Sequence, residues 1–152
     1  VESEGVSMKS GNERWFGEPR PVDQYVPRPS VHVVTRDPAN RIAAVQAPMG
    51  LFLPGGGIEH DESVEEAAIR EAAEEAGLRI RVVSEIGVAN ECVVPAGARH
   101  RLVNHSTFLR AVVVDQGRGT EPDHSLVWLE QAEAEASLTY ESHKWAINRD
   151  SA

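Results

Sequence analysis

The chain has 152 residues, of which 41% are hydrophobic and 26% are charged, as is usual for a single soluble globular domain. Its formal net charge of −9 disfavours binding to the phosphate backbone of a long nucleic acid. No apolar run approaches the ~20 residues that a membrane span needs. The one cysteine, Cys92, excludes an internal disulfide and fits a reducing, cytoplasmic setting.

Residues 1–28 are predicted to be an irregular extension, because their prolines and glycines discourage regular structure, and residues 29–150 are predicted to form one domain. Apolar and β-branched runs predict strands at 31–35, 42–47, 51–53, 80–83, 86–94, 107–114 and 126–129. Turns are expected at 37–40, 54–57 and 95–97, and helices at 64–76, 130–136 and 140–148. One helix between strands and two at the end indicate an α/β fold with helices on both faces of a mixed sheet.

The helix at 64–76 has clear sequence signals at both ends. Ser63 is followed three residues later by Glu66, which predicts a capping box, and Gly77 is a typical residue just beyond a helix C-terminus. Between Glu59 and Glu75 the sequence carries eight carboxylates against one arginine, Arg70. Such a density of like charge on one helix calls for a physical explanation.

At ~100° per residue, Val64, Ala68 and Ala72 define a buried stripe on this helix, and Glu71 and Glu75 fall inside the same sector. The ordinary alternative, a solvated acidic face, accounts for glutamates on the opposite side but not for this pair. Two carboxylates in an apolar stripe are costly unless a cation compensates them, and the helical angle of the single arginine points away from both. A divalent metal is the economical explanation, and Mg²⁺ suits a site made only of oxygen ligands.

The order of residues around this helix resembles a known family motif. Gly56, five residues, Glu62, seven residues and then Arg70-Glu71-Ala72-Ala73-Glu74-Glu75-Ala76-Gly77-Leu78 is similar to the Nudix box, G-x5-E-x7-R-E-U-x-E-E-x-G-U. Every fixed position is present, and the one soft departure is Ala72, where a bulkier aliphatic residue is usual. A looser similarity extends over residues 29–149.

This resemblance to the Nudix (MutT-like) hydrolases implies an α/β Nudix fold, a mixed sheet sandwiched between α-helices. It also implies an enzyme that hydrolyses the diphosphate linkage of a nucleoside diphosphate joined to another moiety. A nucleoside triphosphate, a nucleotide sugar and a compound of the ADP-ribose type are the candidate substrates, with Mg²⁺ as the cofactor and Mn²⁺ as its substitute.

Carried over residue by residue, the resemblance implies that Glu71 and Glu75 are the principal metal ligands. Glu74 is implied as a further ligand or as the carboxylate that takes a proton from water, and Gly56 is implied to offer its backbone carbonyl to the metal. Arg70 and Glu62 correspond to a pair that braces the glycine loop against the helix, with an ordinary surface ion pair as the alternative.

Outside the box, the expectations are weaker and their alternatives stay open. An acidic residue after the sheet often assists in this family, so Glu121 and Asp123 are candidates, although an ordinary turn also explains them. Arg28 and Tyr25 could contact a base or phosphate, and Arg99 belongs to a basic cluster that could meet phosphates or simply be a solvated hairpin tip.

Two other functional classes remain open at this stage. A nucleotide-binding sensor with the same fold and no turnover is the main alternative, and an acidic interaction module with a structural cation is a second. The sequence does not fix the substrate, the number of metal ions or whether the chain forms a homodimer.

Overall fold

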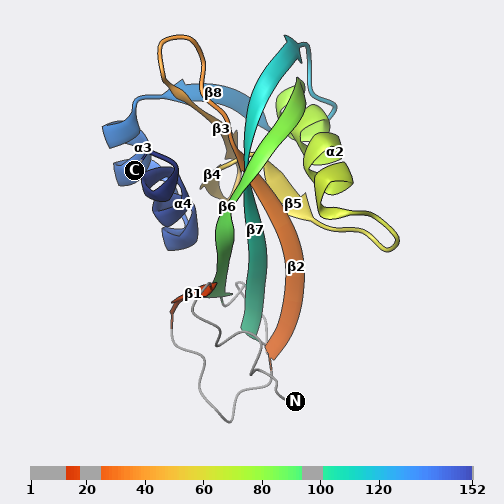
Figure 1. Ribbon diagram of the computed structural model, residues 1–152, viewed down its shortest axis with the longest axis vertical. Helices are drawn as coiled ribbons and strands as arrows, with labels where there is room; N and C mark the ends of the chain where they lie inside the picture. Colours follow the sequence, from red (N-terminus) through yellow and green to blue (C-terminus); the bar gives the residue numbers. More distant parts are fainter. Residues whose placement is uncertain (1–12, 18–24, 94–100, 152) are drawn as a thin grey trace.

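The computed structural model describes residues 13–17, 25–93 and 101–151, apart from the side chains of Tyr25, Val26 and Arg101 (Figure 1). Five strands form a mixed sheet in the order β1 (Glu13–Phe16), β6 (Leu78–Val93), β7 (Arg101–Gln116), β2 (Tyr25–Val34) and β5 (Gly55–Gly57). Three more form an antiparallel sheet in the order β4 (Gly50–Phe52), β3 (Ile42–Ala47) and β8 (Ser125–Leu129). The helices are α2 (Val64–Ala76), α3 (Gln131–Ser137) and α4 (Glu141–Ser151).

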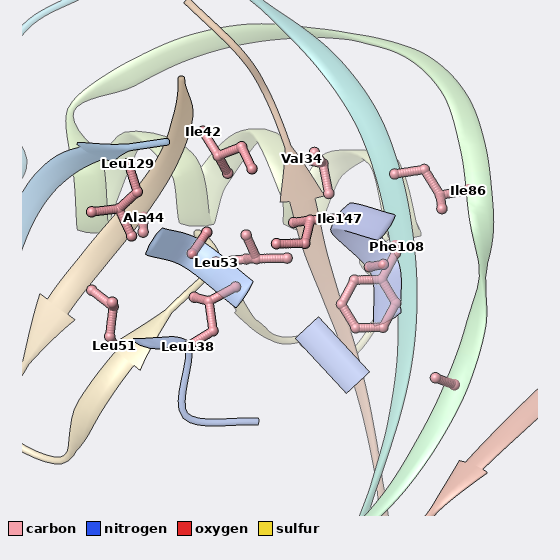
Figure 2. Close-up of a cluster of buried hydrophobic side chains, with 13 residues drawn as sticks. Val34, Ile42, Ala44, Leu51, Leu53, Ile86, Phe108, Leu129, Leu138 and Ile147 are labelled. Atoms are coloured by element: carbon pink, nitrogen blue, oxygen red, sulfur yellow. The ribbon is translucent and has the colours of Figure 1, made fainter. Parts of the chain in front are cut away.

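The strands lie between helices, with α2 on one side and α3 and α4 on the other (Figure 1). Two hydrophobic clusters hold these layers together. One contains the buried alanines of α2 with strand residues such as Val31 and Leu109. The other packs α3 and α4 through side chains such as Phe108, Leu53 and Ile147, which point toward one another in Figure 2. The α/β fold with helices on both faces is thus confirmed, with the strands divided between two sheets.

The ends of α2 are also as predicted. The Ser63 hydroxyl accepts the Glu66 backbone N–H while the Glu66 carboxylate accepts the Ser63 backbone N–H, which completes the capping box. Gly77 ends the helix in the left-handed conformation, at φ 68°, and its N–H bonds back to the last turn. The acidic helix therefore begins and ends where its sequence dictates, and this fixes which carboxylates share a face.

The prediction of an irregular segment over residues 1–28 is wrong for the two parts that are described. Glu13–Phe16 forms β1, which pairs with β6 in parallel, and β2 begins at Tyr25. Pro27 and Pro29 are tolerated in β2 because β5 pairs with it only from Ser30 onward, and the Pro29 carbonyl, which accepts the Ile58 N–H at 3.1 Å, needs no proline N–H. Pairing with strands far away in sequence overrides the local signal.

The boundaries of two other predicted elements are also corrected. The triple glycine at 55–57, predicted as a turn, is the short strand β5 at the edge of the larger sheet. The two strands predicted at 80–83 and 86–94 are one strand, β6, whose register with β7 shifts near Val82 and Glu85. The turn predicted at 95–97 lies outside the described residues. Across the described chain, each helix is too short or too polar to cross a membrane.

Helix α4 is fixed at its N-terminus by a side chain from another element. The carboxylate of Glu91, on β6, accepts the backbone N–H groups of Glu141 at 3.2 Å and Ser142 at 2.9 Å. A carboxylate at this position satisfies donors that lack partners within the helix and favourably meets the helix dipole. Glu91 therefore determines where the segment that enters α4 lies.

We expect Glu91→Ala to lower the free energy of unfolding by about 2 kcal/mol, because two backbone donors, of which the Ser142 N–H is buried, lose their acceptor. Glu91→Gln should cost less, since an amide oxygen still accepts one bond. Urea denaturation at constant pH measures both. Glu85→Ala, exposed on the same strand, is the control, and an equal loss in both alanine variants would contradict the capping role.

Candidate functional site

The acidic face of α2 lies against the glycine strand β5. The backbone N–H of Gly55 donates a hydrogen bond to Oε1 of Glu75 at 2.9 Å. A Cβ atom added to Gly56 would collide with the carboxylate of Glu71, and one added to Gly55 would collide with the Val31 carbonyl and with His32. Glycine is therefore required here for close approach, and it brings backbone and two carboxylates together at one edge of the sheet.

Arg70 joins the loop before α2 to the helix. Its Nε donates to Glu62 Oε2 at 2.6 Å and its Nη2 donates to Glu62 Oε1 at 2.9 Å, a bidentate pair, while Nη2 also donates to the Gly57 carbonyl at 3.1 Å. The hydrogen bond from Arg70 lowers the pKa of Glu62 to about 2, with a further contribution from the backbone N–H of Glu59. Arg70 and Glu62 thus form an ion pair that ties the segment after β5 to the helix.

The expectation that Arg70 points away from Glu71 is wrong. Its Nη1 lies 3.2 Å from Glu71 Oε2 and 3.2 Å from Glu74 Oε1. The helical angle gives the direction of Cβ, whereas the long arginine side chain folds along the surface to reach neighbouring residues. Glu74 is the more exposed of the two, at 40% of its side chain against 13% for Glu71. Arg70 therefore partly compensates Glu71 and Glu74, and does not contact Glu75.

Glu71 and Glu75 have the electrostatic strain expected of carboxylates at the edge of a core. Burial raises the pKa of both, and it raises that of Glu75 to about 7, with an added contribution from the negative charge of Glu71. The Gly55 N–H and the nearby His124 act in the opposite direction on Glu75 but do not cancel the effect of burial. A cation placed between these carboxylates would relieve the cost of ionising them.

A cleft of about 670 Å³ opens in front of this pair. One wall holds the glycine strand, Glu71 and Glu75, and the segment after β7 adds Glu121, Asp123 and His124. This segment is held by the C-terminus of α2, because Thr120 N–H donates to the Glu74 carbonyl at 2.9 Å. The rest of the lining comes from the β3–β4 turn and from the side chains of Arg28, His32, Phe52 and Tyr140.

His124 adds a nitrogen ligand to the acidic wall. Its Nδ1 lies 2.8 Å from Asp123 Oδ1, which leaves Nε2 directed toward Glu75 Oε2 at 3.8 Å. One ligand atom each from Glu75, Glu121 and His124 lies within 4.8 Å of the others, a spacing that could hold a metal ion. A carboxylate that orients the imidazole of a metal-binding histidine is a common arrangement. The site therefore offers carboxylate oxygens and an imidazole nitrogen.

Comparison with known proteins agrees with this site. The family model described as the NUDIX domain matches residues 26–149. The chain belongs to the Nudix hydrolase family. The glycine strand, the Glu62–Arg70 pair and the carboxylates of α2 all lie in its signature motif.

Two curated relatives from Arabidopsis thaliana match shorter parts of the chain. The chloroplastic Nudix hydrolase 21 is 48% identical over 46 residues, 30% of this chain and 23% of that protein. Nudix hydrolase 4 is 35% identical over 75 residues, 49% of this chain and 34% of that protein. The matches thus cover about a third or less of those relatives. A solved NUDIX hydrolase from Nitrosomonas europaea superposes with a TM-score of 0.64 at 20% identity, over 83% of this chain and 89% of that one, and shows the shared fold.

The Nudix site gathers some predicted residues and leaves out others. Gly56, Glu71, Glu75, Glu121 and Arg28 all line the cleft. Glu74 does not, because it lies beside Arg70 on the outer side of the helix. Arg99 and the side chain of Tyr25 lie outside the described residues.

The cleft residues missed by the sequence analysis include His32, Phe52, His124 and Tyr140. None belongs to the Nudix box, and only His124, next to two acidic residues, had a local signal. His143, on α4, is a further residue without a local signal in the sequence. It is buried, its Nδ1 accepts the Leu53 N–H at 3.1 Å, and burial lowers its pKa well below the usual value.

The raised pKa of Glu75 predicts a pH-dependent difference between the metal-free protein and its Glu75→Gln variant. The pKa of this carboxylate rises from 4.5 to about 7 on folding. Its contribution to the free energy of unfolding is therefore complete below pH 4.5 and is lost as the pH rises to about 7. Buried His32 and His143, with lowered pKa values, act in the opposite direction. They do so in both proteins, so the comparison isolates Glu75.

We therefore expect Glu75→Gln, relative to the parent, to gain about 2 to 3 kcal/mol of unfolding free energy between pH 5 and pH 8. Urea denaturation in EDTA at each pH gives the two curves. Glu66→Gln, exposed and still able to form the capping box, should differ from the parent by a constant amount. A constant difference for Glu75→Gln as well would show that its carboxylate is ionised at no cost.

Proposed function

We propose that this chain is a divalent-cation-dependent pyrophosphohydrolase that cleaves the diphosphate linkage of a nucleoside diphosphate joined to another moiety. A nucleoside triphosphate, a nucleotide sugar or a compound of the ADP-ribose type fits this description. The proposed catalytic domain spans residues 29–150, and a reducing, cytoplasmic setting agrees with its single cysteine.

The observation that carries the proposal is the state of Glu75. Its side chain is only 17% exposed and faces an open cleft, and the nearest basic group described is His124, at 3.8 Å. Burial raises its pKa to about 7, which is costly for a carboxylate that serves only the fold. A site that binds a cation between phosphates and carboxylates accounts for both the cost and the open cleft.

The residues of the cleft fit a divalent cation. Glu71 and Glu75 would hold it, together with the carbonyl of Gly56, while His124 adds a nitrogen donor on the adjacent loop. Oxygen donors suit Mg²⁺, and the imidazole makes Mn²⁺ an effective substitute. When bound, the cation neutralises charge on the phosphates and lowers the pKa of the attacking water.

Two arginines, Arg70 and Arg28, position the site and its substrate. Arg70 joins Glu62 to the Gly57 carbonyl and so keeps β5 in register with the helix, which holds Glu71 and Glu75 at the cleft. Arg28 lines the cleft beside Gly57 and supplies positive charge for a phosphate. A phosphate at Arg28 would leave the neighbouring scissile linkage near the carboxylates.

Two carboxylates compete for the role of proton acceptor. The family resemblance favours Glu74, but its carboxylate contacts Arg70 and does not line the cleft. Glu121 lines the cleft and lies 3.3 Å from His124 Nδ1, so it can approach a water molecule at the scissile phosphate. We assign proton acceptance to Glu121, whereas Glu74 supports the site through its contact with Arg70.

The proposal is tested by assaying nucleoside triphosphates, nucleotide sugars, ADP-ribose and dinucleoside polyphosphates with Mg²⁺ and with Mn²⁺. Glu71→Gln and Glu75→Gln should each lower kcat at least about 100-fold and weaken metal binding, because each removes a charge from the cation site. Their circular dichroism spectra should match that of the parent. Glu66→Gln, outside the cleft, should retain activity. Absence of turnover across the panel would instead favour a nucleotide-binding sensor.

The assignment of the acceptor makes a separate prediction. Glu121→Gln should lower kcat by about 100-fold at saturating Mg²⁺, because an amide cannot accept the proton of the attacking water. Glu74→Gln should lower kcat by less than about tenfold under the same conditions. The reverse order of effects would return the role to Glu74.

A further inference from the structure

Two histidines pack against each other next to the glycine strand β5, and the hydrolytic proposal gives neither of them a role. His143 on α4 is 2% exposed, and its ring centroid lies 4.4 Å from that of His32 on β2. The ring of Phe108 packs on both, at centroid distances of 5.6 Å from His143 and 5.7 Å from His32. A polar ring in such surroundings costs free energy unless it forms a hydrogen bond.

His143 forms its hydrogen bond with the short connection between β4 and β5. Its Nδ1 accepts the backbone N–H of Leu53 at 3.1 Å. Burial and the neighbouring His32 lower the pKa of His143 well below its usual value, so the ring is neutral and Nδ1 keeps the lone pair that this bond needs. Pro54 follows and has no N–H, so Leu53 is the last backbone donor before Gly55.

Leu53, Pro54 and Gly55 are each anchored on a different element. The Leu53 N–H binds His143 on α4. The Pro54 carbonyl accepts a backbone N–H of β2 at 2.9 Å, and the Gly55 N–H donates to Oε1 of Glu75 on α2, also at 2.9 Å. Only two soft dihedral angles per residue separate these planar groups. The direction of the Gly55 N–H, and with it the place of the Glu75 carboxylate, therefore depends on how Leu53 is held.

His32 transmits the same constraint through packing. It lies opposite Gly55 in the β2–β5 pairing, and a Cβ atom built on Gly55 would collide with the His32 ring. The ring is thus held between β5 and the ring of His143. Its Nδ1 is buried without a hydrogen-bond partner among the described residues, so this nitrogen ties His32 to none of them. His143 therefore supports Gly55 twice, once through Leu53 and once through His32.

The two ends of β5 are fixed by different parts of the chain. Arg70 of the Nudix box donates to the carbonyl of Gly57 at 3.1 Å, at one end of the strand. At the other end, Gly55 is anchored through β2 and α4, which contain no residue of the box. The family motif thus accounts for one end of the strand that faces the carboxylates, and His143 accounts for the other.

We propose that His143 is a positioning residue for the cation site. It fixes the backbone N–H of Gly55, which in turn holds the carboxylate of Glu75 at the cleft. The inference rests on the proposed function for the nature of the ligand, a divalent cation, but not for the reaction that follows binding. It deepens that function by extending the site to a side chain that does not line the cleft. The affinity of the site for a cation should therefore depend on the hydrogen-bond acceptor at position 143.

The test measures binding of Mn²⁺ without substrate, by the electron paramagnetic resonance signal of free Mn²⁺. His143→Leu keeps apolar volume but offers no acceptor to Leu53, and it should weaken Mn²⁺ binding about tenfold, as is typical when a group that orients a metal ligand is lost. His143→Asn should restore most of the affinity, because its side-chain oxygen can take the place of Nδ1.

Ile147→Ala is the matched control. Ile147 lies one turn further along α4, in the core cluster of Figure 2, and its truncation removes apolar volume without removing the acceptor of the Leu53 N–H. It should lower stability to urea but leave the affinity for Mn²⁺ unchanged. An unchanged affinity in His143→Leu, an equal loss in Ile147→Ala, or no recovery in His143→Asn would overturn the proposal.

A measurement on the parent protein serves as the test if His143→Leu does not fold. Because coupling between two sites is reciprocal, a cation at Glu75 must alter the hydrogen bond between Leu53 and His143. Addition of Mg²⁺ should therefore shift the nitrogen resonances of the Leu53 amide and of His143 Nδ1, although neither residue lines the cleft. His105, bonded to Asn90 and also outside the cleft lining, should not shift. Unchanged signals from Leu53 and His143 would overturn the proposal.

Assays of hydrolysis separate this inference from the proposed function. If the parent is active, His143→Leu should lose activity about tenfold when Mg²⁺ is limiting and regain it when Mg²⁺ is saturating, because mass action offsets a weakened affinity. A loss that saturating Mg²⁺ does not restore would overturn the positioning role and leave the activity standing. Absence of turnover in the parent, with Mn²⁺ affinity that falls in His143→Leu and returns in His143→Asn, would support the positioning role and defeat the proposed activity.

Discussion

The arrangement of this protein's site depends on two carboxylates placed where a helix meets the core. Glu71 and Glu75 share the buried side of α2 with its alanines, and they face the glycine strand β5 instead of bulk water. Burial raises the pKa of both, so ionising them costs free energy that the surrounding fold must supply. The close approach of β5, the small residues of α2 and the open cleft all follow from accommodating this pair. With a larger residue at Gly56 the carboxylate of Glu71 would have to move, so the alanine-rich helix and the glycine strand form one unit.

Arg70 compensates the negative charges of this unit unequally. It satisfies Glu62 with two hydrogen bonds, which lower the pKa of that carboxyl to about 2, and it also reaches Glu71 and Glu74. Glu75, one turn beyond Glu71, is left to the Gly55 N–H and to His124. The same arginine therefore stabilises the glutamates that hold the loop and leaves Glu75 without a strong partner. That asymmetry divides the acidic residues into ones that support the fold and ones available to a cation.

How much of this could be predicted depended on whether the signal was local. The ends of α2 are determined within a few residues, by Ser63 with Glu66 and by Gly77, and they were predicted correctly. The conformation of the triple glycine was not, because β5 exists only through its pairing with β2, some 25 residues away. The reach of Arg70 toward Glu71 was missed because a helical wheel places Cβ atoms and not guanidinium groups. The burial of His143 has no local signal either, because it arises from the packing of α4 against Leu53 and the ring of Phe108. Contacts between distant segments have no signature in a single sequence.

The cleft combines two walls with different origins, and this has a consequence for how the site can vary. The carboxylates are fixed by α2 and β5, whose internal contacts do not involve the β3–β4 turn or Tyr140. The part of the lining that holds Phe52 and Tyr140 is fixed by Thr139 against Leu51 and by Glu91 at the start of α4. Because the two sets of contacts share no residue, a substitution at Met49 or Phe52 can alter the lining of the cleft without disturbing the groups that compensate Glu71. Charge compensation is thus confined to one helix and one strand, and the rest of the lining belongs to surfaces that other strands and helices add to the same cleft.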